Sequence, residues 1–231
     1  MLKMESVTKH YTHRGRNVKA LENVTLEIPR GDFVSVVGPS GSGKSTLLLT
    51  FGGMLSPAAG RVVVDGQSVY ELTLEDRALL RRKKVGFVFQ TFNLVPYLRA
   101  LENVQIPLYL AGLDSAAQAQ RATALLERVG LGDRLDHKPS ELSIGQQQRV
   151  ALARVLANDP ELILADEPTG NLDPETSAQI LGLLDELNRE GRTVVIVTHD
   201  PRAAQRAKRT LKLVDGRILP DGQPGTTRPS A

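Results

Sequence analysis

The stretch "GPSGSGKST" at residues 38–46 constrains the fold of this chain more than any other feature. It fits the pattern G-x-x-x-x-G-K-[ST], in which glycines let backbone amides wrap a phosphate, Lys44 reaches the β- and γ-phosphates, and Ser45 offers a hydroxyl to Mg²⁺. The apolar run "FVSVV" comes before it and the apolar pattern "STLLLTFGGM" follows, so it is expected to join a buried strand to a helix. A plain glycine-rich turn is the alternative, but it gives Lys44 no role. We therefore expect a nucleotide to be bound by Gly38, Pro39, Ser40, Gly41, Ser42, Gly43, Lys44, Ser45 and Thr46.

Strand and helix patterns alternate along the rest of the chain, which predicts an α/β fold with a mainly parallel sheet. The apolar runs "KVGFVFQ", "ELILAD" and "RTVVIVTHD" are further strand candidates. Between the last two lies a helical pattern that Asp173 is placed to cap and Pro174 to open. The first thirty residues alternate apolar and polar side chains, as strands do. Hairpin signals at Asp65-Gly66 and Asp215-Gly216 predict antiparallel strands, which we expect to form a side sheet.

These elements indicate a single domain over residues 1–220 with a P-loop (RecA-like) core. The core and its side sheet are expected to comprise residues 1–90 and 159–220. Residues 91–158 read as an inserted helical subdomain, with a helical pattern from about residue 98 onwards. Residues 221–231 are polar and rich in Pro and Gly, which predicts a flexible tail.

Polar side chains follow two of the predicted strands at their carboxyl ends. "LILADE" runs into Asp166 and Glu167, and His199 ends "TVVIVTH". Ligands gather at this edge of a parallel sheet. Neighbouring residues on a strand face opposite ways, so the two carboxylates should differ in role: Asp166 suits the Mg²⁺ shell, and Glu167 suits polarisation of an attacking water. The alternative for the carboxylates is a strand cap in solvent, and a strand-end histidine by itself is more often structural.

A second anion site is predicted at "ELSIGQQQRVALARVL", residues 141–156. Ser143, Ile144 and Gly145 form a turn-like stretch, and a helical pattern begins after it. A small polar turn that opens onto a helix N-terminus attracts anions. Two phosphate sites in a chain of 231 residues need an explanation.

The composition argues against several other classes of protein. Twenty-nine Lys and Arg residues face 26 Asp and Glu residues, a net charge of +3 that is too weak and dispersed to indicate nucleic-acid binding. The one dense basic run, at residues 81–84, reads as a solvated helix end. The chain has no cysteine, and its four histidines show no metal-ligand spacing. No signal peptide and no membrane span is recognisable, so we expect a soluble, cytoplasmic protein.

The motifs together resemble those of ATP-binding-cassette (ABC) ATPases. "GPSGSGKST", "FQ" at residues 89–90, "LSIGQQQ", "LILADEP", "NLD" and "VTHD" occur in that family's order, over essentially the whole chain. The stretches "GFVFQTFNLVPYLRALENVQIPL" and "LADEPTGNLDPET" look most like the macrolide-exporter and lipoprotein-releasing branch.

The resemblance implies a role for each motif residue. Residues 38–46 become Walker A, and Asp166 and Glu167 become Walker B and the catalytic base. Gln90 becomes the Q-loop residue, which senses Mg²⁺, and Asp173 becomes the D-loop residue. His199 becomes the switch histidine, and Tyr11 matches the aromatic residue that stacks on adenine.

The resemblance also explains the second anion site. In this family two copies pair head to tail, and the signature turn of one caps the γ-phosphate bound by the other. Ser143, Gly145 and Gln146 match that turn, whereas Ile144 stands where the family usually has glycine. Because a β-branched residue disfavours a positive φ, Ile144 predicts an extended or helical backbone at this position.

The implied function is that of the ATP-hydrolysing subunit of an ABC transporter, with ATP and Mg²⁺ as ligands. It would form a homodimer on ATP binding and drive separate permease subunits, peripheral on the inner face of the cell membrane. The branch favours export or extraction from the membrane. The alternatives are a mechanotransmission complex without a transported substrate and a soluble ABC protein of DNA repair or translation.

The apolar cluster in residues 90–98 suggests a docking groove for a membrane-protein helix. Its members are Phe92, Leu94, Val95, Tyr97 and Leu98. A buried loop core is the alternative.

Overall fold

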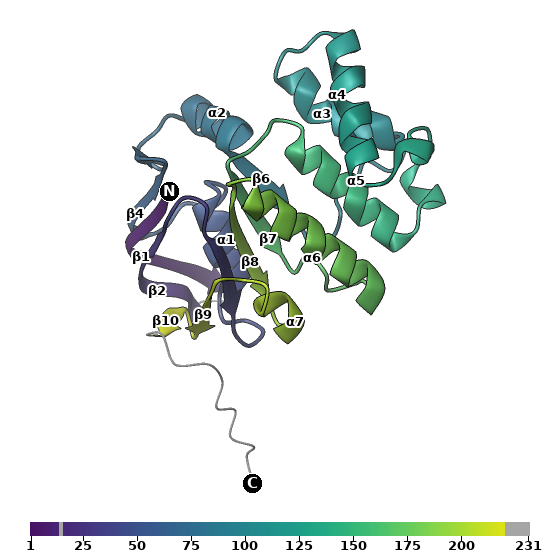
Figure 1. The fold of residues 1–231 in the computed structure, drawn as a ribbon. Coiled ribbons are helices and arrows are strands. Elements are labelled where there is room, and N and C mark those ends of the chain that lie inside the picture. Colours follow the sequence, from purple (N-terminus) through teal and green to yellow (C-terminus); the bar gives the residue numbers. More distant parts are fainter. Residues whose placement is uncertain (14–15, 220–231) are drawn as a thin grey trace.

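The computed structural model describes residues 1–13 and 16–219 (Figure 1). The expected tail at residues 221–231 lies outside the described residues. A six-stranded sheet forms the centre, in the order β10-β9-β3-β8-β7-β6, and all of its neighbouring pairs are parallel except β10 with β9. Its strands are β3 (Phe33–Val37), β6 (Val85–Val88), β7 (Leu162–Asp166), β8 (Thr193–Thr198), β9 (Arg209–Val214) and β10 (Arg217–Leu219). The α/β class with a mainly parallel sheet is confirmed.

The second sheet is antiparallel and has the order β2-β1-β4-β5. Its strands are β1 (Leu2–His13), β2 (Arg16–Ile28), β4 (Ala59–Val64) and β5 (Gln67–Ser68). Asp65 and Gly66 both have positive φ, 51° and 81°, as the two central residues of a type I′ hairpin require. This hairpin therefore belongs to the side sheet, as its sequence predicts.

The prediction for the hairpin at Asp215-Gly216 is wrong in one respect. The turn forms, with positive φ at both residues, but β9 pairs in parallel with β3 and β10 continues from it. Leu211 and Leu213 of β9 are buried in the core, which holds the strand against the central sheet. The hairpin thus extends the central sheet as an antiparallel edge instead of joining the side sheet.

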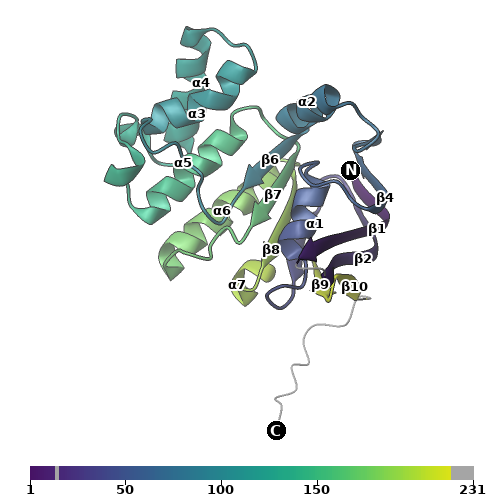
Figure 2. The same ribbon diagram turned by 180° about the vertical axis from the view of Figure 1, so that it is seen from behind.

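Side chains on the two faces of the central sheet enter two different cores, because successive strand residues point to opposite faces. Val34 and Val36 of β3 pack with α1 (Lys44–Phe51) and the side sheet, whereas Phe33 packs on the other face. That other face is covered by α6 (Pro174–Arg189) and α7 (Pro201–Ala204). Helix α1 therefore lies between the two sheets (Figures 1 and 2).

The helical segment that follows β6 has a core of its own. It contains α3 (Ala100–Leu110), α4 (Ser115–Arg128), two 3-10 turns (Gly132–Arg134 and Pro139–Glu141) and α5 (Ile144–Leu156). Val150 and Ala153 of α5, together with its C-cap Ala157, are buried in this core. Helix α5 runs beside α6, and this contact joins the helical segment to the central sheet (Figure 1).

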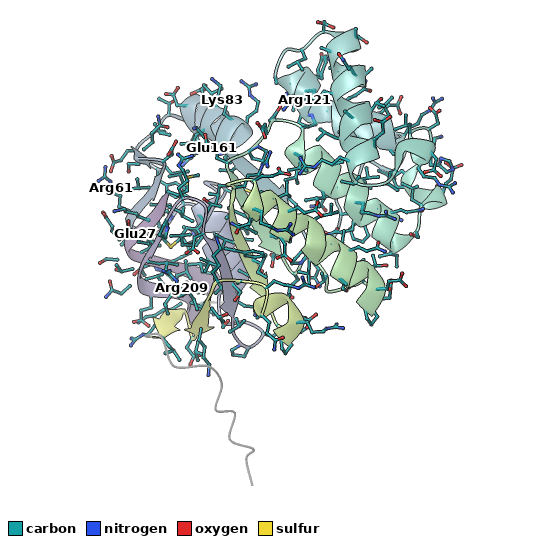
Figure 3. All side chains as sticks on the ribbon, in the orientation of Figure 1. Glu27, Arg61, Lys83, Arg121, Glu161 and Arg209 are labelled. Carbon is teal, nitrogen blue, oxygen red and sulfur yellow. The ribbon has the colours of Figure 1, made fainter. Side chains whose placement is uncertain are left out.

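The basic run at residues 81–84 ends α2 (Leu74–Lys84), as predicted, but it is only partly solvated. Lys83 points away from the protein (Figure 3), while Arg81 donates to the Gly53 carbonyl at 3.0 Å. Lys84 forms ion pairs with Asp65, at 3.1 Å, and with Glu161. Arg30 pairs with the same two carboxylates. We call these four residues the Glu161 ion cluster; it joins the side sheet, α2 and the start of β7.

Within the described ranges, no helix combines the length and the apolar character that a membrane crossing requires.

Candidate nucleotide site

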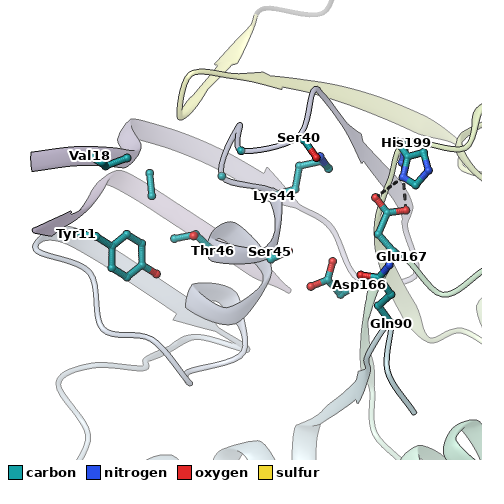
Figure 4. A pocket seen from close by; sticks show the side chains of 13 residues that line it. Tyr11, Val18, Ser40, Lys44, Ser45, Thr46, Gln90, Asp166, Glu167 and His199 are labelled. Carbon is teal, nitrogen blue, oxygen red and sulfur yellow. Dashed lines mark hydrogen bonds and ion pairs between the residues drawn. The ribbon is translucent and has the colours of Figure 1, made fainter. Parts of the chain in front are cut away.

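A pocket of about 460 Å³ opens where the carboxyl ends of the central strands meet the side sheet (Figure 4). It is lined by residues from β1, β2, the loop before α1, α1 itself and the ends of β6, β7 and β8. These are Tyr11, Val18, Ala20, Ser40, Gly41, Gly43, Lys44, Ser45, Thr46, Gln90, Asp166, Glu167 and His199. Eleven of these thirteen residues are expected from the sequence.

The loop at residues 38–46 is shaped by glycines. Gly41 and Gly43 have φ of 78° and 101°, values that L side chains rarely adopt. A Cβ on Gly43 would lie 2.0 Å from the Ala20 carbonyl oxygen, and one on Gly38 would lie 2.0 Å from that of Leu213. The loop can therefore pass close to both sheets only with glycine at these positions. Gly38, Pro39 and Ser42 support the loop without lining the pocket.

Lys44 and the N-terminus of α1 give the pocket positive character. The Lys44 ammonium donates to the Gly38 and Pro39 carbonyls, at 2.9 and 3.0 Å, and so bends back over the loop. The first amides of a helix have no partner within it and attract anions. Lysine, helix N-terminus and glycine loop together can accommodate a chain of phosphates.

Asp166, the last residue of β7, has a carboxyl whose pKa lies above its ordinary value. Burial raises the pKa of its carboxyl, the nearby charge of Glu167 raises it further, and a hydrogen bond with the Ser45 hydroxyl and the charge of Lys44 act in the opposite direction. A half-buried carboxylate beside a hydroxyl fits Mg²⁺, which binds oxygen ligands and usually takes only one or two carboxylates from the protein. Among the described residues there is no cluster of three or more potential His, Cys, Asp or Glu ligands. The rest of the shell would have to come from phosphates and water.

Glu167 lies beside Asp166 in the pocket because its backbone is left-handed, with φ of 45°. An extended backbone would direct the two side chains to opposite faces. Glu167 is 13% exposed and accepts three hydrogen bonds. They come from the His199 ring Nδ1 at 2.8 Å, the His199 backbone N–H at 3.3 Å and the Thr198 hydroxyl at 3.2 Å. Figure 4 shows His199 beside the Glu167 carboxylate. The carboxylate is therefore held in one orientation.

The side-sheet end of the pocket is apolar. Tyr11 on β1 pairs in register with Val18 on β2, and Ala20 follows on the same face of β2. The ammonium group of Lys9 lies 5.5 Å from the centre of the Tyr11 ring. Sequence reasoning missed Val18 and Ala20, although their alternation along β2 was a signal that they share a face.

Gln90 follows β6 and enters the pocket from the opposite side (Figure 4). Its backbone carbonyl accepts from the Asn171 side-chain amide at 3.4 Å.

Ser143, Gly145, Gln146 and Asp173 do not line this pocket. Ser143 is the N-cap of α5: its hydroxyl oxygen accepts from the Gln146 N–H at 3.2 Å, and the Gln146 side chain accepts from the Ser143 N–H at 2.9 Å. Ile144 is the first residue of α5 and does not have a positive φ, which confirms the expected helical backbone. Its side chain is 53% exposed.

The N-terminus of α6 lies against that of α5. Asp173 caps α6 by accepting from the backbone amides of Glu175 and Thr176, both at 3.0 Å, and from the Thr176 hydroxyl at 2.5 Å. These bonds hold the pKa of the Asp173 carboxyl below its ordinary value. A Cβ on Gly145 would lie 2.3 Å from the Thr176 methyl carbon. The predicted site residues thus form two groups, one in the pocket and one at the paired helix N-termini.

The mainly parallel sheet, the glycine loop that opens α1, and the acidic strand end beside Lys44 define a P-loop nucleotide triphosphatase.

Comparison with known proteins identifies the family. Residues 21–170 match the family model described as ABC transporter. A macrolide export ATP-binding/permease protein MacB from Hyphomonas neptunium is 48% identical over 96% of this chain, which spans 34% of that relative. An uncharacterized ABC transporter ATP-binding protein from Thermotoga maritima is 47% identical, over 94% of this chain and 93% of the relative. The chain belongs to the ABC transporter family, and it is an ATPase.

A solved structure agrees with this assignment. The dimeric structure of a post-hydrolysis state of the ATP-binding cassette MJ0796, bound to ADP and Pi, matches with a TM-score of 0.89 at 45% identity, over 94% of this chain and 96% of that one. The family resemblance predicted from the motifs is confirmed. The chain spans about a third of the length of the MacB relatives that it matches.

Proposed function

We propose that this ATPase binds ATP and Mg²⁺ in the 460 Å³ pocket, pairs with a second copy around two nucleotides, and drives a membrane permease that exports its substrate. The observation that carries the proposal is the split of the site residues. Lys44, Asp166 and Glu167 share one pocket, whereas Ser143 caps a different helix outside it.

Within the pocket, each residue has a separate task. The loop at residues 38–46 and Lys44 bind the phosphates, and Tyr11 stacks on the adenine. A bound Mg²⁺ would offset the charge of the phosphates, with Ser45, Asp166 and the Gln90 side chain available as ligands. The Asp166 carboxylate is half-buried, and the Ser45 hydrogen bond and the Lys44 charge do not fully offset the cost of burying its charge. A bound cation would therefore be favoured beside it.

Glu167 acts as the general base. Its three hydrogen-bond donors fix the carboxylate at the mouth of the pocket, where it can accept a proton from the attacking water. His199 donates from Nδ1 to Glu167 in this arrangement. An imidazole that also donates from Nε2 to the γ-phosphate carries both protons and a positive charge.

The second copy supplies the anion site that the pocket lacks. The Ser143 oxygen accepts a hydrogen bond from Gln146, which leaves its O–H free to donate to a phosphate. The amides of Ile144 and Gly145 open α5 and have no partner within the helix. Because these groups lie outside the pocket of their own protomer, a head-to-tail pair would bring them to the partner's ATP. The related cassette MJ0796 is described as a dimer.

An apolar groove of about 440 Å³ is the proposed permease contact. It lies between α2, β6, α3 and α5, and its lining includes Phe87, Phe89 and Leu110. Phe89 directly precedes Gln90, so a segment in the groove would touch the chain next to the ATP pocket. The relatives named as combined ATP-binding and permease proteins support a permease as the occupant, and their macrolide-export names support the direction.

The groove contains none of residues 90–98, where the sequence predicts a docking surface. Leu94 packs against the core of the helical segment, and the Val95 N–H donates to the buried Asn103 side chain at 2.8 Å. Both residues therefore stabilise the loop. Tyr97 is 74% exposed and remains available to a partner.

The proposal is tested by purifying the tagged chain with its membrane partner from native membranes and measuring ATP hydrolysis and transport in vesicles. Leu110→Glu should abolish co-purification of the permease and its effect on ATPase rate, with the basal rate unchanged. Tyr109→Glu, at the neighbouring exposed position outside the groove, is the matched control. Permease binding that survives Leu110→Glu would contradict the proposed contact. A permease complex that hydrolyses ATP without moving any solute would contradict the transport function.

A further inference from the structure

A single side chain links helix α5 to the residue after Glu167. The Gln148 amide nitrogen donates to the Pro168 carbonyl at 2.9 Å. Gln148 is 1% exposed, so water does not compete for this bond. Because Pro168 directly follows Glu167, the bond fixes the chain at the point where the left-handed backbone turns the carboxylate into the pocket.

One turn earlier, helix α5 also contacts the far end of the segment 167–173, which begins at Glu167. Gly145 and Gln148 are three residues apart and share a face of α5. Gly145 lies against Thr176, whose hydroxyl bonds the Asp173 carboxylate at 2.5 Å. Helix α5 therefore holds the segment 167–173 at both ends.

The second polar atom of Gln148 shows that stability alone does not account for this residue. Its side-chain oxygen is buried and has no hydrogen-bond partner among the described residues. An unpaired buried carbonyl destabilises the folded state, and a methionine of similar shape would avoid that cost. Gln148 thus provides a hydrogen-bond donor to the Pro168 carbonyl even though its own side-chain oxygen is left without a partner.

We propose that Gln148 is a positioning residue for ATP hydrolysis, which sets the orientation of Glu167 through the Pro168 carbonyl. The inference rests on the proposed role of Glu167 as the base. Helix α5 begins at Ser143, which is proposed to contact the partner's ATP. A shift of α5 on engaging that nucleotide would reach Glu167 through Gln148, so that each protomer hydrolyses its own ATP only when its helix α5 is seated on the other.

The first test is Gln148→Met, assayed in the full-length protein for kcat, KM and thermal stability. We expect kcat to fall about 10- to 100-fold, the scale of a misplaced catalytic group, with the KM for ATP unchanged. The melting temperature should stay the same or rise, because the unpaired oxygen is removed. Gln118→Met is the matched control, since the Gln118 amide also donates to a backbone carbonyl, that of Leu113, but lies in α4 away from the pocket. A lower melting temperature with unchanged kcat would overturn the proposal.

A double-mutant cycle with Glu167→Gln shows whether Gln148 acts through Glu167. We expect Gln148→Met to reduce the residual rate of Glu167→Gln by less than twofold. A full 10- to 100-fold loss in that background would overturn the proposal. Near-normal activity of Glu167→Gln alone would instead refute the base assignment, which is a separate result.

Gln148→Glu provides a pH readout and a second variant should the methionine protein not fold. A charged carboxylate faces the Pro168 carbonyl without a donor, whereas a protonated carboxyl can donate to it. The kcat of Gln148→Glu relative to the wild type should therefore rise as the pH is lowered. A ratio independent of pH would contradict the role of this hydrogen bond.

Discussion

The ring Nδ1 of His199 lies 2.8 Å from Oε1 of Glu167, and the backbone N–H of the same histidine contacts Oε2. One residue at the end of β8 therefore holds both oxygens of a carboxylate at the end of β7. Parallel pairing of the two strands brings these ends together, with Asp166 opposite Val197. The pairing of β7 with β8 thus supplies two of the contacts that orient the proposed base.

Glu167→Gln keeps the shape of this side chain and removes its ability to accept a proton. Hydrolysis should fall by about 10² or more, the scale of general-base catalysis. Nucleotide binding should survive, and an ATP-bound dimer should accumulate on gel filtration. Turnover close to that of the wild type would rule out Glu167 as the base.

Asp166→Asn should abolish hydrolysis and yet stabilise the protein in the absence of nucleotide and Mg²⁺. Burial raises the pKa of the Asp166 carboxyl above its ordinary value of 3.8, so the folded state binds this proton more tightly than the unfolded chain. The free energy of unfolding is then lowered as the pH rises through the raised pKa. Asparagine carries no such charge. The free energy of unfolding of Asp166→Asn should therefore exceed that of the wild type at pH 7, and the difference should vanish towards pH 3. Denaturant unfolding at several pH values measures the difference, and parallel pH curves for the two proteins would contradict it.

Ser143→Arg should separate nucleotide binding from dimerisation. A long cation would replace the small hydroxyl that caps α5, and its bulk would hold two protomers apart. The affinity of the single chain for ATP should change little, because the pocket does not contain Ser143. Titration with a fluorescent nucleotide and gel filtration measure the two properties. Weaker binding by the monomer, or an unimpaired dimer, would refute the two-site arrangement.

Ile144→Gly should preserve the ATP-dependent dimer. The backbone at Ile144 is already helical, so glycine relieves no strain there. Its flexibility should cost at most about 0.5–1 kcal/mol of stability. A loss of dimerisation comparable to that of Ser143→Arg would show that the exposed isoleucine side chain itself makes the contact.

The Glu161 ion cluster should contribute stability that acid removes. A hydrogen bond from Lys84 is the main cause that lowers the pKa of both Asp65 and Glu161. Lowered carboxyl pKa values stabilise the fold above the unfolded-state pKa, and this stability is lost as the pH falls through the folded-state values. Glu161→Gln should therefore lower the free energy of unfolding by about 1 kcal/mol at pH 7, and the two proteins should be equally stable below about pH 4.

Urea unfolding at pH 7 and at pH 3.5 measures this cost. Glu71→Gln is the control, because the ion pair of Glu71 with Arg61 is far more exposed. An equal effect for both variants would show that the cluster adds nothing beyond a surface pair.

Much of the pocket could be predicted because it depends on local patterns and one topological rule. Lys44 follows from the loop motif, and Asp166 and His199 lie together because parallel strands end at the same edge. Val18 could not be placed in the same way. Its neighbour across the strand depends on the register of β1 with β2, which shifts at several irregular positions.

Contacts between segments far apart in the sequence were out of reach for the same reason. Asp215-Gly216 is a local hairpin signal, but only the long-range pairing of β9 with β3 decides which sheet the hairpin joins. The bond from Gln148 to Pro168 depends on how α5 packs against the centre of the molecule. Patterns along the chain specify which face of a helix is buried, but not which carbonyl that face meets.

The apolar end of the pocket has a consequence for nucleobase selectivity. Tyr11, Val18 and Ala20 offer a ring face and two aliphatic side chains. Stacking acts on the flat surface that adenine and guanine share, whereas discrimination requires hydrogen bonds to the base edge. The site is therefore expected to recognise its nucleotide mainly through the triphosphate, and to bind and hydrolyse GTP nearly as well as ATP.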